Sequence, residues 1–484
     1  MSISSALLSA TSGISAASRR ASTVSNNVAN ALTPGYARRE LSVSENIVNG
    51  RGAGVTVNGD VRAANRALTT DRRLAEGASG RDQMIADAYK GFNASMGEPG
   101  DSFSLFTQYQ NLETGLRALS QTPESQPLQA QVLDAAKALA SRFQELSADA
   151  GGARQNADAL INREVEAVNA ALQEIERLNG DISAASATGR EFAALEDQRQ
   201  RLIDEVSRAI PVREVPRNNN TIDLMTDEGV FLIAGSARTV EFTPTAVITP
   251  DLTLAGGALS GLSVNGVDIT PGGTGLSLRE GTIAGHFEVR DAVAPGFQAQ
   301  LDGLARDLIE RFEGIDPTLT AGDPGLFTDA GAAFDPANEL GLASRIAVNA
   351  AVDPDQGGET WRLRDGLAAT TQGPSAANDI ITIFLDALTE VRTPPAGTGL
   401  NAAQNAASAV ANVTSAVGSA RISAEESLAS SAARTQLLSD AELAVTAVDT
   451  DQELQQLVLI EQAFTANARI IQAADEMLRT LMEL

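Results

Sequence analysis

Small apolar residues recur in alternating steps of three and four at the start of the chain. This spacing averages 3.5 residues and is typical of a helix that packs lengthwise against another helix. It predicts one long helix over about residues 1–31. The series consists of Ile3, Leu7, Ala10, Ile14, Ala17, Ala21, Val24, Val28 and Ala31.

The other end of the chain carries a matching series. Residues 1–50 contain four Arg and two Glu, a net +2, whereas residues 440–484 contain nine acids and two Arg, a net −7. Opposite charges favour pairing of the two ends. Alternatively, each series is an amphipathic helix lying on a globular core. The C-terminal series consists of Leu457, Ile460, Phe464, Asn467, Ile471, Ala474, Leu478 and Leu481.

A turn interrupts the first helix at residues 33–36, Thr-Pro-Gly-Tyr. Pro34 fixes its own φ and disfavours the α region for Thr33, and Gly35 can take the positive φ of a type II turn. Helix 1–31 should therefore end here, and Tyr36 should lead into an extended segment.

Helical spacing dominates residues 60–210. We predict a long antiparallel helix pair in which one helix starts at Thr122, with breaks near Gly151 and Gly180. A further helix is expected from residue 191 to about 209, where Pro211 ends it.

Short apolar runs between Gly, Asn and Pro follow at 212–278 and predict strands. Asn265 and Gly266 indicate the clearest hairpin, because both central residues of a type I′ turn need positive φ. Helical spacing returns at 289–312. One more strand is expected at 344–349, and helix from about 376 to the end with a break near 393–399.

The fold class that follows is mainly α with a β insertion. We expect terminal helices that form a coiled-coil inner domain, a long-helix bundle domain and a small outer β domain. The predicted division is 1–50 and 440–484 for the inner domain, 51–211 and 279–439 for the helical domain with a loop-rich stretch at 314–373, and 212–278 for the β domain.

Composition excludes several classes of partner. A net charge of −26 opposes nucleic acid and anionic membrane surfaces, both of which attract basic proteins. No run approaches the 18 or so apolar residues of a membrane helix. The first basic residue is Arg19, so the start lacks the charged-then-apolar order of a cleaved signal peptide. The chain has no cysteine.

Catalytic and ligand-binding patterns are absent. His286 is the single histidine, and neither Lys90 nor Lys137 follows a glycine as in a phosphate loop. Glycines 50, 52 and 54 are spaced as in a turn between strands rather than a dinucleotide fingerprint. We therefore expect no catalytic residue, no cofactor and no metal.

Both ends resemble those of bacterial flagellar axial proteins. Residues 25–40, SNNVANALTPGYARRE, are similar to the N-terminal signature of that family, and residues 459–481, LIEQAFTANARIIQAADEMLRTL, to its closing helix. Residues 281–301 are also similar to a segment of that family, with an Arg-Asp pair followed by Pro-Gly and an aromatic residue. Within the family, the form Thr-Pro-Gly-Tyr resembles that of the hook-associated members at the hook–filament junction.

The resemblance implies a structural protein and not an enzyme. Such proteins are secreted through the flagellar export apparatus without a cleaved signal peptide and become part of the extracellular flagellum. The implied partners are further copies in a ring, the hook protein, a second junction protein, and a cytoplasmic export chaperone at the C-terminal helix. We expect no nucleic acid and no membrane insertion.

The terminal helices should then line a shared tube, and free ends should stay poorly ordered until copies meet. Asn26, Asn27 and Asn30 are candidates for hydrogen bonds that set the register between copies. Alternatives are another axial protein (a flagellin, the second junction protein or the hook protein), or a secreted adhesin or surface enzyme. The full set of candidate assembly residues is Ile3, Leu7, Ile14, Val24, Asn26, Asn27, Val28, Asn30, Thr33, Pro34, Gly35, Tyr36, Leu457, Ile460, Phe464, Asn467, Ile471, Leu478 and Leu481.

Overall fold

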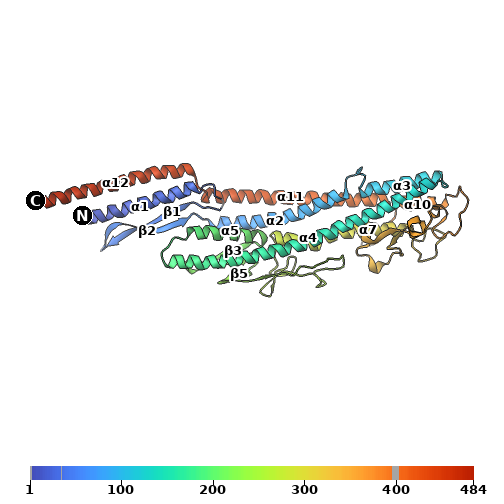
Figure 1. Ribbon diagram of the computed structural model, residues 1–484, viewed down its shortest axis with the longest axis horizontal. Helices are drawn as coiled ribbons and strands as arrows, with labels where there is room; N and C mark the ends of the chain where they lie inside the picture. Colours follow the sequence, from blue (N-terminus) through green and yellow to red (C-terminus); the bar gives the residue numbers. More distant parts are fainter. Residues whose placement is uncertain (1–2, 34, 49, 395–402, 484) are drawn as a thin grey trace.

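The computed structural model describes residues 3–33, 35–48, 50–394 and 403–483. It is an elongated, mainly helical rod with a few small sheets, and both ends of the chain lie together at one end of the rod (Figure 1). In the described part, no helix is long and apolar enough to cross a membrane.

The two terminal helices lie side by side. Helix α1 (Ile3–Ala29) packs along α12 (Thr450–Glu483), which confirms the predicted pairing of the ends. An antiparallel hairpin follows α1 and folds back along it, with β1 (Arg39–Val48) pairing with β2 (Arg51–Arg62). The predicted turn between strands is present here, with Gly50 at φ 73°.

Long helices build the rod. They are α2 (Arg66–Met96), α3 (Leu105–Gln121), α4 (Gln126–Ala187), α5 (Ala193–Ala209) and α11 (Ala406–Thr446). In Figure 1, α2 and α4 run along the rod while α11 lies beside α2.

Helix α4 contradicts two sequence-based expectations. It is continuous over 62 residues, so the predicted breaks near Gly151 and Gly180 are wrong. A glycine inside a helix costs only about 1 kcal/mol relative to alanine, which the buried residues on either side offset. The helix starts after Ser125 rather than at Thr122, which instead ends α3.

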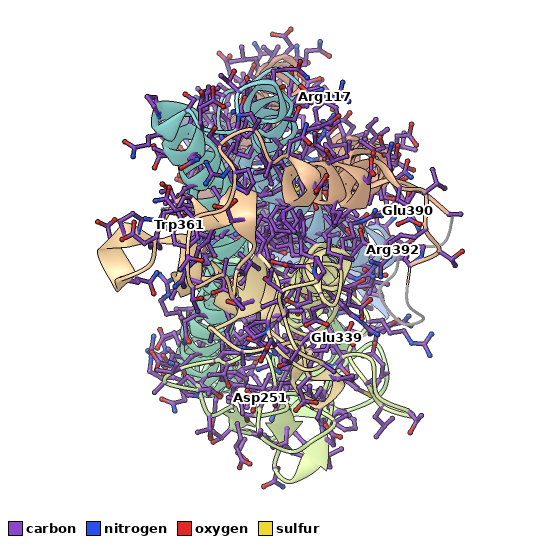
Figure 2. All side chains as sticks on the ribbon, turned by 90° about the vertical axis from the view of Figure 1, so that its right-hand side faces the viewer. Arg117, Asp251, Glu339, Trp361, Glu390 and Arg392 are labelled. Atoms are coloured by element: carbon purple, nitrogen blue, oxygen red, sulfur yellow. The ribbon has the colours of Figure 1, made fainter. Side chains whose placement is uncertain are left out.

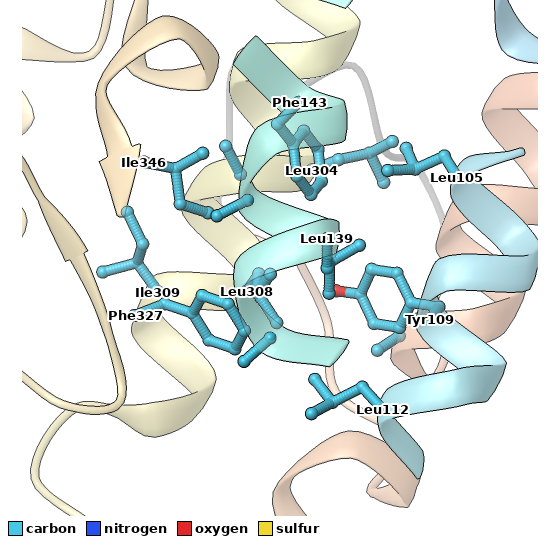
Figure 3. Packing of buried hydrophobic residues seen from close by; sticks show 14 of the residues in the cluster. Leu105, Tyr109, Leu112, Leu139, Phe143, Leu304, Leu308, Ile309, Phe327 and Ile346 are labelled. Atoms are coloured by element: carbon cyan, nitrogen blue, oxygen red, sulfur yellow. The ribbon is translucent and has the colours of Figure 1, made fainter. Parts of the chain in front are cut away.

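The larger hydrophobic core fills the far half of the rod (Figure 3). Leu105, Tyr109 and Leu112 of α3 meet Leu139 and Phe143 of α4 there. Other residues of this core come from α2, α7 (Ala294–Phe312), α10 (Asp379–Thr389), α11 and the loop-rich stretch 314–373. Burial of the Tyr109 ring raises the pKa of its phenol.

Helical structure returns at residue 282, before the predicted start at 289. Helix α6 (Thr282–Glu288) continues through a π-helical turn, Val289–Val293, into α7 (Ala294–Phe312). The π turn brings Arg290, which is fully buried, to Asp158 of α4, with 2.7 Å between Arg290 Nη1 and Asp158 Oδ1. This ion pair attaches the helical segment Thr282–Phe312 to α4.

The predicted strands at 212–278 form two small antiparallel sheets. One has the order β3-β4-β5-β6 and the other β7-β8-β9. The Asn265–Gly266 hairpin is confirmed, with φ of 50° and 78° and Val264 paired to Val267. The strands are β3 (Val212–Pro216), β4 (Ile222–Thr226), β5 (Phe231–Ala234), β6 (Ser236–Ala237), β7 (Val240–Glu241), β8 (Ser263–Val264) and β9 (Val267–Asp268).

Polar side chains of α4 bind the backbone of these sheets. Asn169 donates from Nδ2 to Val240 O at 2.9 Å and accepts from Val240 N at 2.8 Å. Asn179 makes the same pair of bonds to Ile222, at 2.8 and 3.3 Å. The β region is therefore held along α4 by hydrogen bonds that replace missing strand partners.

The loop-rich stretch 314–373 lies at the end of the rod opposite the termini, and Trp361 and Glu339 belong to it (Figure 2). The predicted strand is present as β11. The elements here and beyond are β10 (Phe327–Asp329), α8 (Leu342–Arg345), β11 (Ile346–Val348), α9 (Arg362–Asp365) and α10 (Asp379–Thr389), with short 3-10 turns at 218–220, 336–338, 350–352 and 354–356.

Candidate assembly surface

The two terminal helices come close together at Gly13 and Asn467. A Cβ placed on Gly13 would lie 2.8 Å from Asn467 Oδ1, so a larger residue would force this amide to move. Ala10, Ala17 and Val24 of the N-terminal series are buried nearby on α1. Asn467 belongs to the C-terminal series, whereas Gly13 lies beside Ile14 of the N-terminal series and is not part of it.

Most of α12 has no cover within the part of the chain that the structure describes. Its main packing partner is α1, and Ala474 is its buried apolar residue. Apolar side chains this exposed and this contiguous mark an interaction surface. The large apolar residues of α12 that remain exposed are Leu454, Leu457, Val458, Leu459, Phe464, Ile470, Met477, Leu478, Leu481 and Met482.

The turn after α1 has the geometry of a type II turn. Tyr36 N donates to Thr33 O at 3.1 Å, and Gly35 has φ 77°. Pro34, which the sequence places at the first central position, lies outside the described residues. A Cβ on Gly35 would lie 2.8 Å from Cγ of Arg201, so the turn packs tightly on α5.

Asn27 fixes the path of the chain through this turn. Its side chain is 1% exposed. Asn27 Nδ2 donates to Arg39 O at 2.9 Å, while Oδ1 accepts from Arg39 N at 3.0 Å and from the Tyr36 hydroxyl at 2.8 Å. Within the described chain, Asn27 thus joins the end of α1 to the start of β1. The Asn27 amide oxygen and nitrogen thus bond within their own chain, and the side chain is buried away from a neighbouring copy.

Asn30 has a local role as well. Its Nδ2 donates to Asn26 O at 2.9 Å, and its Oδ1 accepts from the Thr33 hydroxyl at 3.2 Å. These bonds satisfy backbone and side-chain groups at the end of α1. Asn26 itself is exposed and accepts only through its backbone.

One carboxylate anchors the base of the hairpin to the rod. Asp197 of α5 accepts from Arg39 Nη2 at 2.6 Å and from Arg62 Nε at 2.8 Å. Burial raises the pKa of the Tyr36 phenol, which lies 4.9 Å beneath the Arg39 guanidinium. The hairpin is therefore attached to α5 by a nearly buried carboxylate.

The last two helices meet at this same place. Arg38 N donates to Thr446 O at 2.8 Å, and residues 447–449 separate α11 from α12. The predicted domain boundary at residue 440 falls inside α11, which continues to Thr446. The turn after α1 and the break before α12 thus form one joint.

A charged network next to the joint holds α11 to the rod. Arg72 of α2 pairs with Asp204 at 2.7 Å and also with Glu442 of α11, while Arg73 pairs with Asp204 at 2.7 Å. Burial alone would raise the pKa of Asp204, but Arg73 and Arg72 outweigh it and lower that pKa below 3.8.

No catalytic chemistry emerges among the described residues. Nε2 of His286 lies 3.4 Å from Glu164, and that histidine is buried inside the rod. No group of three or more acidic or histidine side chains in the described ranges is arranged to hold a metal ion. A cavity of about 1480 Å³ lies between α6 and the loops at 250–278, and no residue of α1 or α12 is among those that line it.

The sequence-derived residues thus gather at one end of the rod. Ile3, Leu7, Ile14, Val24 and Val28 lie on α1, and the C-terminal set lies on α12. The sequence analysis did not identify Arg201, which packs against the turn at Gly35, or Asp197, which pairs with the arginines at the base of the hairpin. Both lie on α5, about 160 residues away in sequence, and no local pattern points to them.

Three segments of the chain match models of flagellar protein families. Residues 91–318 match the family model "Flagellar hook-associated protein FlgK helical domain". Residues 7–36 match "Flagella basal body rod protein", and residues 443–484 match "Flagellar basal body rod FlgEFG protein C-terminal".

Two curated relatives align over nearly the whole chain. Flagellar hook-associated protein 1 of Escherichia coli is 23% identical and is covered completely, as is this chain. The Bacillus subtilis protein of that name is 23% identical over 96% of this chain and 95% of its own. A solved structure, the flagellar hook junction protein of Burkholderia pseudomallei, aligns over 54% of this chain and 47% of its own, with a TM-score of 0.44 and 20% identity.

Proposed function

We propose that the chain is a member of the flagellar hook-associated protein 1 family and a structural subunit of the junction between hook and filament, assembled through its terminal helices. The observation that carries the mode of assembly is the exposed apolar surface of α12. Leu459 and Met477 are two of its large side chains, and they are 63% and 53% exposed in the described structure. We infer a structural role rather than a catalytic one.

Several copies would bury this surface against one another. Complete burial of an exposed large apolar side chain contributes roughly 1.5–3 kcal/mol. The ten on α12 are between 37% and 87% exposed, so each would contribute part of this amount. The turn after α1 would set where the terminal helix pair ends and the rod begins. Gly35 against Arg201, and Arg39 against Asp197, support this fixed geometry.

The proposed partners are further copies in a ring, the hook protein on one side and a second junction protein on the other. A cytoplasmic export chaperone at the C-terminal helix fits the same surface, because α12 would need cover before assembly. We propose secretion through the flagellar export apparatus without a cleaved signal peptide.

Electron microscopy of flagella that carry an epitope-labelled copy tests the assignment. The label should form one band between hook and filament. Label along the whole filament or the whole hook would contradict the assignment and favour a sibling axial protein. A variant that lacks residues 450–484 serves as the control and should not enter the flagellum.

A further inference from the structure

Asparagine precedes glycine at four places in the chain, at residues 49–50, 58–59, 179–180 and 265–266. Asn49 lies outside the described residues. In such a pair, the backbone nitrogen of the glycine can attack the side-chain amide of the asparagine, because glycine has no Cβ that would hinder the approach. The fold decides which of the three described pairs is free to react.

The pair Asn265–Gly266 is free on both sides of this reaction. The Asn265 side chain is exposed and makes no hydrogen bond among the described residues. The backbone N–H of Gly266 donates no hydrogen bond in the described part of the chain either. A Cβ placed on Gly266 would meet nothing within 4 Å, so open space surrounds the nitrogen.

Asn179 is held in place instead. Its amide exchanges two hydrogen bonds with the backbone of Ile222, and its Oδ1 also accepts from Arg199 Nη1 at 2.9 Å. Gly180 lies inside α4, where backbone N–H groups bond along the helix. Neither reacting group of this pair is available in the folded chain.

Asn58 is restrained by the long hairpin. It lies at a bulge of β2, between Val57, which pairs with Val43, and Gly59, which pairs with Ser42. The two strands continue to pair on both sides of the bulge. A change in the backbone dihedrals of Asn58 therefore has to disturb an extended ladder.

We propose that Asn265 is the site at which the folded chain spontaneously deamidates and isomerises. A solvent base removes the proton of the Gly266 backbone nitrogen, and this nitrogen attacks Cγ of Asn265. The Cγ–Nδ2 bond breaks, and Nδ2 leaves as ammonia with a proton from water. The product is a cyclic imide that contains the Gly266 nitrogen.

Water then opens the imide at either of its two carbonyl carbons. Opening at Cγ gives aspartate, whereas opening at the main-chain carbonyl gives isoaspartate, in which the main chain runs through Cβ and Cγ. Over the two steps, one amide and one water become one carboxylic acid and one ammonia. No electron is transferred, so the reaction needs no oxidant, reductant or enzyme.

The short hairpin around Asn265 permits the change of shape that the attack requires. Asn265 has φ 50° and has to leave this conformation before its Cγ can meet the next nitrogen. Strands β8 and β9 contribute two residues each, so opening of the turn breaks few backbone bonds. Local opening of this kind costs much less than global unfolding.

Conversion changes the wall of the large cavity beside α6. Gly266 and Asp268 are among the residues that line this cavity. A carboxylate at residue 265 adds negative charge near Asp268, and isoaspartate lengthens the main chain of a turn whose type I′ geometry depends on two central residues. The pairing of β8 with β9 should therefore loosen as the chain ages.

Ageing of the purified full chain in mildly alkaline buffer tests the site. The tryptic peptides 52–62, 178–190 and 239–279 each contain one of the three asparagines. Mass spectrometry should show conversion several-fold faster at Asn265 than at Asn58 or Asn179. In urea, where the chain is unfolded, the three rates should become similar.

Two results would overturn the proposal. One is conversion at Asn58 or Asn179 that is as fast as conversion at Asn265 in the folded chain. The other is an equally large preference for Asn265 in urea, because the fold would then have no part in the choice of site.

Replacement of the asparagine tests the effect on the hairpin. Asn265→Gly removes the amide and keeps a residue that accepts positive φ, so the hairpin should still form. Ageing should increase protease cleavage within residues 259–270 of the wild type several-fold and leave that of Asn265→Gly unchanged. Asn58→Gly is the matched control and should age as the wild type does. An equal increase in the aged Asn265→Gly variant would overturn the proposed loosening.

Discussion

Tyr36 donates its phenolic hydrogen to Oδ1 of Asn27 at 2.8 Å, across the turn that ends α1. The same oxygen accepts from the backbone of Arg39. One buried amide thus holds the helix, the turn and the first strand of the hairpin together.

Removal of this amide should loosen the joint. Asn27→Ala leaves the Arg39 N–H and C=O and the Tyr36 hydroxyl without partners, at about 1–3 kcal/mol for each buried group left unsatisfied. Tyr36→Phe removes only one bond and should cost about 1 kcal/mol. Hydrogen exchange at the Arg39 amide should be much faster in the first variant than in the second. Equal exchange in the two would contradict the central role of Asn27.

Gly35→Ala should destabilise the turn for two reasons. The φ of 77° is unfavourable for alanine, and the new Cβ would collide with Arg201. Gly50→Ala is the matched control, because Gly50 has φ 73° with nothing within 4 Å. We expect the first variant to be exported and to fail in assembly, and the second to support filament growth. Similar behaviour of both would show that contact with α5 is unimportant.

The double replacement of Pro34 and Gly35 by alanine should extend α1 and block assembly as well.

Gly13→Ala should weaken the pairing of the terminal helices. Its Cβ would lie 2.8 Å from Asn467 Oδ1, and that amide donates to Ala463 O at 2.9 Å. Limited proteolysis should then remove both ends faster than in the wild type. Adding Asn467→Ala makes room and should restore the wild-type rate. If the second change fails to help, the close contact is not the cause.

Asp204 should give the rod an acid-sensitive contact. Arg73 and Arg72 hold its folded-state pKa below the unfolded value of 3.8, despite burial. A depressed pKa stabilises the fold above the unfolded pKa, and this contribution is lost as pH falls through the folded pKa. Asp204→Asn should therefore lower thermal stability at pH 7 and narrow the stability difference from the wild type below about pH 4. A difference that stays constant with pH would exclude this origin.

Asn169→Ala should detach part of the β region from α4. Val240 would lose both backbone partners, a loss of about 2 kcal/mol or more. Asn162→Ala is the control one heptad earlier on α4, because Asn162 bonds only to Glu166 at the surface. Protease cleavage within residues 212–278 should increase for the first variant alone. Unchanged cleavage would mean that side-chain packing holds the region without these bonds.

Much of the fold could be predicted from local sequence patterns. The Asn265–Gly266 hairpin follows from two residues whose φ must be positive, and the two heptad series follow from spacing alone. The π turn at 289–293 was not predictable, because its stability depends on Arg290 reaching Asp158 from another helix.

The candidate site was predictable only in part. The two heptad series predicted the helices α1 and α12, which pair at one end of the rod; their role in assembly stays a prediction. Asn27 was expected to serve contacts between copies, but its partner Arg39 returns to it only because the hairpin folds back beside α1.

Helix α4 has a mechanical consequence. At 62 residues it spans about 90 Å, and both the β region and the larger core are fastened to it, so it acts as the stiff strut of the molecule. Gly151 and Gly152 sit near its middle, with no neighbour within 4 Å of where a side chain would project. Under a sideways force the strut should flex first at this glycine pair, which would let a rotating shaft deform there elastically while its attachments at either end keep their shape.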